Sequence, residues 1–172
     1  MGLEDDIGKL ARIPAFAAIE PEALRLIAFS AETRNLRAGD VLFRRDEISN
    51  DGFVLLAGSI AMDASGDGAA TARIVRPPGL IGDLALLTQT RRPATAIARE
   101  PSTVLRISRQ LFRRVLQEFP VSAERLRQSL RASLLQFTGE LGAVRRGSFT
   151  VEGDEKAERE KPNDSLPPWR FE

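Results

Sequence analysis

The feature that most limits the possible folds of this 172-residue chain is a series of short β-prone segments between residues 31 and 107. Turn residues separate the candidate strands, which are 32–36, 41–44, 53–57, 59–64, 70–75, 94–99 and 103–107. The run Ser65-Gly66-Asp67-Gly68 predicts a hairpin tip between two of them. Several short strands at this spacing are typical of a sandwich or a roll. A helix-like interruption at 83–87 favours the roll.

Helical patterns flank this β region on both sides. Residues 3–11 and 21–29 are expected to form short helices, and Pro21 suits the first turn of the second. Ser108 is a candidate N-cap for a later helix. The apolar face of that helix contains Leu111, Phe112, Val115, Leu116 and Phe119. Pro120 ends or bends it, and a longer helix is expected over 122–145. The predicted class is therefore α+β, mainly β.

The composition excludes several kinds of chemistry. The chain has no cysteine, no histidine and no tyrosine. Catalytic triads that use histidine, and zinc sites that use cysteine or histidine, are therefore impossible. No specific pair of carboxylates is brought together by helical or hairpin spacing, so we expect no catalytic residue, no metal and no enzyme activity. No apolar run approaches the ~20 residues that span a bilayer, and no signal peptide is evident, so a cytoplasmic location is expected.

The segment richest in chemical information is Ile81-Gly82-Asp83-Leu84-Ala85-Leu86-Leu87, which is followed by Arg92-Pro93-Ala94-Thr95. A glycine turn that opens a short helix presents backbone amides and a partial positive charge to an anion. An arginine can add a planar, charge-assisted fork to the same anion. A nearby carboxylate can accept hydrogen bonds from ribose hydroxyls. These groups together can hold a sugar and a phosphate.

This segment resembles the phosphate-binding cassette of the cyclic-nucleotide-binding domain, the module of protein kinase A regulatory subunits and catabolite-activator-type regulators. Three further segments resemble that family in order and spacing: Ile13-Pro14-Ala15-Phe16, then Leu36-Arg37-Ala38-Gly39-Asp40-Val41-Leu42-Phe43, then Phe53-Val54-Leu55-Leu56-Ala57-Gly58-Ser59-Ile60. The resemblance covers residues 9–146. It implies a double-stranded β-helix, a jelly-roll-like β-roll, with helices at both ends. No helix-turn-helix domain follows, so direct DNA binding is not expected.

The resemblance also implies roles for single residues. Arg92 would pair with the cyclic phosphate, and Gly82 would allow close approach of the backbone to the ligand or an unusual backbone angle. Leu84, Ala85 and Leu86 would donate their amides to phosphate oxygens while their side chains face the core. Asp83 would accept from the ribose 2′-hydroxyl or serve only as a helix N-cap. The candidate ligand-binding set is completed by Pro93, Ala94 and Thr95, where Thr95 either holds the ligand or is an ordinary strand residue.

Four departures from the family pattern leave two hypotheses open. Asp83 replaces a glutamate, Pro93 lacks the N–H that a small residue would offer, and Asp46 stands where glycine is usual. The approach over 78–83 is also one residue short. The first hypothesis is a stand-alone regulatory module that binds cAMP, with cGMP as the other candidate. The second is a degenerate fold that binds no nucleotide and acts as a dimerisation or docking scaffold for an unidentified protein.

The C-terminal third bears on assembly. Leu130, Leu134, Phe137, Leu141 and Val144 alternate four- and three-residue steps, as in a coiled-coil seam. The first half of this face packs either on the chain's own roll or on a second copy, and past Phe137 a second copy in a homodimer is expected. Residues 147–172 hold seven acidic and four basic residues with several prolines, which is typical of disorder. The sequence thus predicts one domain over 1–146 and a disordered acidic tail over 147–172.

Overall fold

The computed structural model describes residues 2–66 and 72–132. The strands are β1 (Glu32–Leu36), β2 (Val41–Phe43), β3 (Ile48–Ser49), β4 (Asp51–Ala57), β5 (Ile60–Asp63), β6 (Arg73–Val75), β7 (Gly79–Ile81), β8 (Thr90–Arg91), β9 (Thr95–Ala98) and β10 (Ser102–Ser108). The helices are α1 (Leu3–Ala11), the 3-10 turn η1 (Pro14–Phe16), α2 (Pro21–Ser30), α3 (Leu84–Leu87) and α4 (Arg109–Glu118), and residues 120–132 are also helical. None of these helices is long and apolar enough to cross a membrane.

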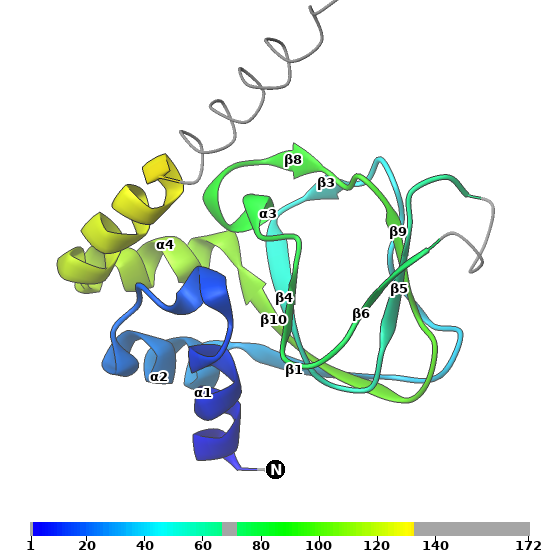
Figure 1. Ribbon diagram of the computed structural model, residues 1–172, viewed down its shortest axis with the longest axis horizontal. Helices are drawn as coiled ribbons and strands as arrows, with labels where there is room; N and C mark the ends of the chain where they lie inside the picture. Colours follow the sequence, from blue (N-terminus) through cyan, green and yellow to red (C-terminus); the bar gives the residue numbers. More distant parts are fainter. Residues whose placement is uncertain (1, 67–71, 133–172) are drawn as a thin grey trace, which may run out of the picture. The chain divides into compact units, whose positions relative to one another are not determined.

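The strands form two four-stranded antiparallel sheets that share one core. Their orders are β1-β10-β4-β7 and β2-β9-β5-β6, and β3 pairs separately with β8. Phe43 of the second sheet packs with Phe53 and Leu55 of the first. Figure 1 shows the strands wound into a roll, with α1, α2 and α4 gathered beside it. The predicted fold, a β-roll with helices before and after it, is confirmed.

The central strand β4 of the first sheet is buried on both faces, which explains its composition. Successive side chains of a strand point to opposite faces. In β4, Phe53 and Leu55 belong to the core inside the roll, whereas Val54 and Leu56 belong to the core under the helices. The four residues Phe53–Leu56 are therefore continuously apolar instead of alternating with polar ones.

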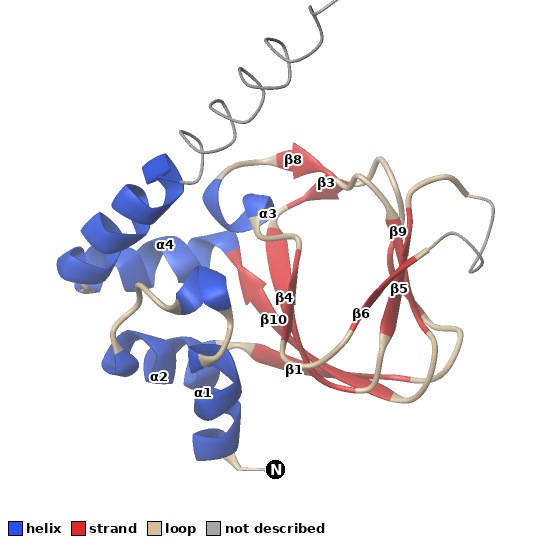
Figure 2. Cartoon of the chain, in the orientation of Figure 1, coloured by secondary structure: helices blue, strands red, loops and turns tan. Residues whose placement is uncertain are grey.

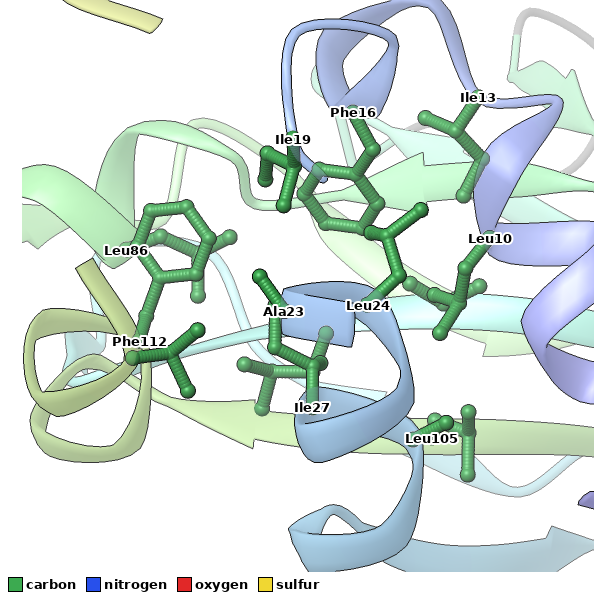
Figure 3. Close-up of a cluster of buried hydrophobic side chains, with 14 of the residues drawn as sticks. Leu10, Ile13, Phe16, Ile19, Ala23, Leu24, Ile27, Leu86, Leu105 and Phe112 are labelled. Atoms are coloured by element: carbon green, nitrogen blue, oxygen red, sulfur yellow. The ribbon is translucent and has the colours of Figure 1, made fainter. Parts of the chain in front are cut away.

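The helices cover the outer face of this sheet with the core shown in Figure 3. Phe16 of η1, Ile27 of α2 and Phe112 of α4 pack with Leu105 of β10. Helix α3 joins the same core through Leu86. This packing matters for the site, because α3 lies between the roll and α4, as Figure 2 shows.

Most predicted elements match the structure to within two residues. The helices over 3–11 and 21–29 are confirmed, as are the seven expected strands, although the described part of the strand expected over 70–75 begins at Arg73. Three strands were not predicted: β3, β7 and β8. Each has only two or three residues and lies among turn residues, so no periodic pattern marks it. The helix α4 ends before Pro120, and a separate helix begins there, so the proline separates two helices.

Several predictions fall on residues outside the described part. They are the seam residues Leu134, Phe137, Leu141 and Val144, the tip residues Asp67 and Gly68, and the acidic tail over 147–172. Leu130 is described and is 38% exposed. The face expected to pack on the roll or on a second copy is therefore seen only at its start.

The helix over 120–132 is fixed to α2 by one buried hydroxyl. The side chain of Ser122 is fully buried. Its Oγ accepts a hydrogen bond from the backbone N–H of Glu20 at 2.9 Å and donates to Glu20 Oε2 at 2.9 Å. Glu20 is the N-cap residue of α2, so this contact joins the start of α2 to the last described helix.

Removing this hydroxyl is expected to destabilise the fold. The substitution Ser122→Ala leaves the Glu20 amide and carboxylate without their partner, which costs about 1–3 kcal/mol of unfolding free energy. Urea denaturation followed by circular dichroism measures the loss. Ser30→Ala, a change of the same kind at an exposed helix end, is the control and should cost less than about 0.5 kcal/mol. Equal stability of the two variants would contradict this role of Ser122.

Candidate functional site

The site begins at the turn between β7 and α3. Gly82 has φ = +74°, a backbone conformation that L side chains rarely adopt. A Cβ placed there would also lie only 2.3 Å from Nη1 of Arg92. The backbone angle therefore favours glycine, and a larger residue would also displace the end of the Arg92 side chain. The unusual backbone angle expected at Gly82 is confirmed, whereas the expected approach of a ligand stays a prediction; the group next to Gly82 in this structure is Arg92.

Helix α3 uses its own amides differently from the expectation. The Leu84 N–H donates to Oδ1 of Asp83 at 3.0 Å, and the amides of Ala85 and Leu86 donate to the carbonyls of Gly82 and Asp83. Asp83 is thus an N-cap residue here. The side chains of Ala85 and Leu86 are buried as predicted, but Leu84 is 60% exposed, so its predicted core position is wrong. A helix of a single turn buries only one of its faces.

Arg92 is the most constrained polar residue of the site. Its side chain is only 5% exposed. Nη2 donates to the backbone oxygen of Asp51 at 2.9 Å and to Oδ1 of Asp51 at 2.6 Å. The guanidinium carbon also lies 4.1 Å from the centroid of the Phe43 ring, a cation–π contact. Burial lowers the pKa of Arg92 from its ordinary value, and the Asp51 carboxylate opposes this change by favouring the charged form.

One donor of Arg92 is unused. Its Nη1 is buried and has no hydrogen-bond partner among the described residues, and it faces the backbone of Gly82. A buried donor without an acceptor is costly, more so on a charged group. An acceptor oxygen placed at the turn of Gly82 would satisfy this donor.

Asp51 connects Arg92 to a chain of charges on the first sheet. Its Oδ2 accepts from Nε of Arg106 at 2.6 Å, and Nη1 of Arg106 lies 3.0 Å from Oε2 of Glu32. Hydrogen bonds from Arg34 and Arg106 hold the pKa of Glu32 below its usual value. Sequence analysis missed Asp51, whose only signal was a carboxylate two residues before the apolar run of β4.

A cavity of about 340 Å³ lies over this turn. An apolar wall from the roll faces the cassette residues across it, and the wall includes Phe43, Met62, Val75, Leu80 and Ile81. Three arginines, Arg73, Arg91 and Arg92, also line it, against one carboxylate, Asp83. The cavity therefore has the size of a small-ligand site and combines an apolar face with an excess of positive charge.

The predicted site residues divide into two groups. Gly82, Asp83, Leu84, Ala85, Arg92 and Pro93 all line the cavity. The remaining three, Leu86, Ala94 and Thr95, do not. Leu86 and Ala94 are buried, and Thr95 Oγ1 accepts from the Arg45 amide at 3.0 Å. The wall residues Met62, Arg73 and Val75 were not predicted, because only the pairing of β5 with β6 brings them to this side of the roll.

Asp46 supports the arginine loop from the other side. Its N–H donates to the backbone oxygen of Arg92 at 2.9 Å, and its own carbonyl accepts from Nη1 of Arg91 at 2.9 Å. It has φ = +67°, the one positive value among the described residues that are not glycine. Asp46 thus keeps the conformation for which glycine is usual, and the departure in sequence is not a departure in backbone.

Comparison with known proteins agrees with this geometry. The family model of the cyclic nucleotide-binding domain matches residues 33–119. A cyclic nucleotide-binding-like protein from Brucella abortus has 39% identity and a TM-score of 0.60, and the match covers 66% of this chain and 98% of that one. The N-terminal domain of a transcriptional regulator from Streptomyces coelicolor has 26% identity and a TM-score of 0.70, and the match covers 77% of this chain and 94% of that one.

A third structure, the catabolite activator protein of Thermus thermophilus, is 22% identical with a TM-score of 0.60 over 76% of this chain and 62% of that one, and it shares the fold. The roll and the family model together define the class of this protein. This chain belongs to the cyclic nucleotide-binding domain family.

The left-handed backbone at Asp46 has a measurable consequence. A glycine variant there should be more stable than an alanine variant by about 1 kcal/mol, because a Cβ is unfavourable at positive φ. At Asp40, which is also exposed but has no positive φ, alanine should be at least as stable as glycine. Thermal denaturation of the four variants compares the two positions. The same order of stability of the glycine and alanine variants at positions 40 and 46 would contradict a strained backbone at Asp46.

Proposed function

We propose that this protein is a regulatory domain, and not an enzyme, that binds a cyclic nucleotide, cAMP with cGMP as the second candidate, in the cavity over Gly82. The observation that carries the proposal is the buried Nη1 of Arg92, which has no hydrogen-bond partner among the described residues and faces Gly82. Family membership supports the same class of ligand. The cyclic phosphate would supply the missing acceptor.

Different cavity residues would contact different parts of the ligand. Arg92 would hold the phosphate with a charge-assisted hydrogen bond. Asp83 lies at the rim of the cavity, where its carboxylate would exchange the Leu84 amide for a ribose hydroxyl. Phe43, Val75 and Leu80 form an apolar wall against which a base can pack. Arg73 and Arg91 raise the local concentration of an anionic ligand.

Asp51 explains how Arg92 remains stable without a ligand. A buried guanidinium that lacks a counter-ion is strongly destabilising. In this structure Asp51 supplies the counter-charge. A phosphate that binds Arg92 either shares the guanidinium group with Asp51 or replaces Asp51 as its partner. If it replaces Asp51, the Asp51 carboxylate still has Arg106 as a partner. In either case neither charge is left buried without a partner.

A route for signalling follows from the packing of α3. Leu86 of α3 and Phe112 of α4 belong to one buried core. A ligand that shifts α3 would thus shift α4, provided that it binds the two arrangements with different affinity. The C-terminal helices are accordingly proposed as the output of the domain.

The second candidate is a fold that has lost its ligand and serves as a scaffold. It is favoured by three observations at the same site. Pro93 has no N–H, Asp83 already accepts from the Leu84 amide, and Arg92 already has Asp51 as a partner. Under this alternative Arg92 is a structural residue only.

Calorimetric titration separates the two. We expect saturable binding of cAMP or cGMP to the wild-type protein, and binding at least tenfold weaker for Arg92→Lys, which keeps the charge but loses the planar fork. Arg99→Lys, an exposed arginine after β9, is the control and should bind as the wild type does. Circular dichroism confirms that each variant folds. No heat with either nucleotide at millimolar concentration would establish the scaffold.

We also propose a homodimer through Leu130 and the seam residues Leu134, Phe137, Leu141 and Val144. Leu130 offers an exposed apolar side chain beside Leu126, and both line an apolar hollow with Leu84 and Phe112. A second copy would cover it. Analytical ultracentrifugation should show a dimer that Leu134→Asp converts to a monomer, because a charge at a seam position is unfavourable. Gln128→Asp, on an exposed position of the same helix, should leave the dimer intact. A wild-type monomer at all concentrations would exclude this assembly.

A further inference from the structure

A second hollow, of about 660 Å³, lies along the outer face of α4 and shares no residue with the nucleotide cavity. Four of its lining residues are arginines: Arg106, Arg109, Arg113 and Arg114. The others are uncharged, and no carboxylate lines it. We call this hollow the arginine groove. Its chemistry is that of a binding surface for anions.

Two of the four arginines are already committed to carboxylates. Arg106 holds Asp51 and Glu32, and Arg114 lies 3.4 Å from Glu118. The charges of Arg106 and Arg114 are therefore already paired with carboxylates of the chain itself.

The other two have donors to spare. Arg109 donates from Nη2 to Asn50 Oδ1 at 2.8 Å, whereas its Nη1 is buried and has no acceptor among the described residues. Arg113 is exposed, and no ion pair or side-chain hydrogen bond joins it to the described residues. A buried guanidinium nitrogen without an acceptor is unfavourable. Both arginines line the groove, where an acceptor can use their remaining N–H donors.

We propose that the arginine groove binds an acidic peptide segment of a partner protein, with Arg109 and Arg113 each holding one carboxylate. The two arginines are four residues apart on α4, so their Cβ atoms are about 5–6 Å apart. In an extended peptide, alternate side chains share one face and are about 6.5 Å apart. Two glutamates separated by one residue therefore match the two guanidinium groups. Gln110 and Gln117 also line the groove, and their side-chain amides can form hydrogen bonds with the peptide backbone.

The charge balance favours a peptide over a nucleic acid. Binding to a polyanion depends on many released counter-ions, and the groove has only two uncommitted cations. The whole chain carries a formal net charge of +1, which is far from the strongly basic surface of a nucleic-acid-binding domain. Two guanidinium groups at this spacing are better suited to binding two carboxylates.

The groove is also connected to the nucleotide site. The backbone carbonyl of Asn50 accepts from the Arg109 amide at 2.8 Å, and the adjacent residue, Asp51, holds Arg92. A partner bound in the groove would thus be next to the residues that a ligand moves. This connection rests on the proposed function, whereas peptide binding itself does not, so the test below uses the protein without nucleotide.

The test is fluorescence anisotropy with a labelled glycine–serine peptide that carries two glutamates separated by one serine. The full chain should bind this peptide at least tenfold more tightly than the same peptide with glutamines. Arg113→Gln and Arg113→Lys should both lose about tenfold in affinity, since lysine keeps the charge but not the fork. Arg125→Gln removes an exposed arginine outside the groove and should bind as the wild type does.

Three results would overturn the proposal. They are equal affinity for the glutamate and glutamine peptides, an equal effect of Arg125→Gln and Arg113→Gln, and tighter binding of a single-stranded oligonucleotide that Arg113→Gln abolishes. Because Arg113 is exposed and makes no ion pair or side-chain hydrogen bond with the described residues, its variants should fold, and circular dichroism checks this directly.

Discussion

The structure depends on the buried ion pair between Arg92 and Asp51. It places a guanidinium group inside the roll, against Phe43, where an unpaired charge would be strongly unfavourable. Three requirements follow from it. Position 82 needs a residue that tolerates a positive φ and leaves room for Nη1 of Arg92, as glycine does. The strand β4 must begin with a carboxylate, and Asp46 must hold the arginine loop through its amide.

The same arrangement connects the cassette to distant parts of the domain. Asp51 joins Arg92 to Arg106 within the first sheet, and its neighbour Asn50 fixes Arg109 at the start of α4. The core under the helices provides a second connection, from Leu86 of α3 to Phe112 of α4. Polar and apolar routes thus both lead from the cavity to the helix that carries the arginine groove.

Much of the fold could be predicted, because its signals are local. The apolar run of β4, the periodic face of α4 and the turn residues between strands each specify an element from adjacent residues. Gly82 and Arg92 were found for the same reason, as parts of one continuous motif. What failed depends on contacts distant in sequence. Asp51 lies 41 residues from Arg92, and β7 is a strand only because it pairs with β4. The exposure of Leu84 follows from which face of α3 meets the core.

The central claim is that Arg92 is the anion receptor of this domain and that Asp51 holds it in place when no ligand is bound. A crystal structure of the protein grown with the cyclic nucleotide that it binds tests this claim most directly. The account predicts a phosphate oxygen within hydrogen-bond distance of Nη1 of Arg92, at the turn formed by Gly82, with Arg106 still paired to Asp51. A nucleotide bound elsewhere, with Nη1 of Arg92 still lacking an acceptor, would contradict it.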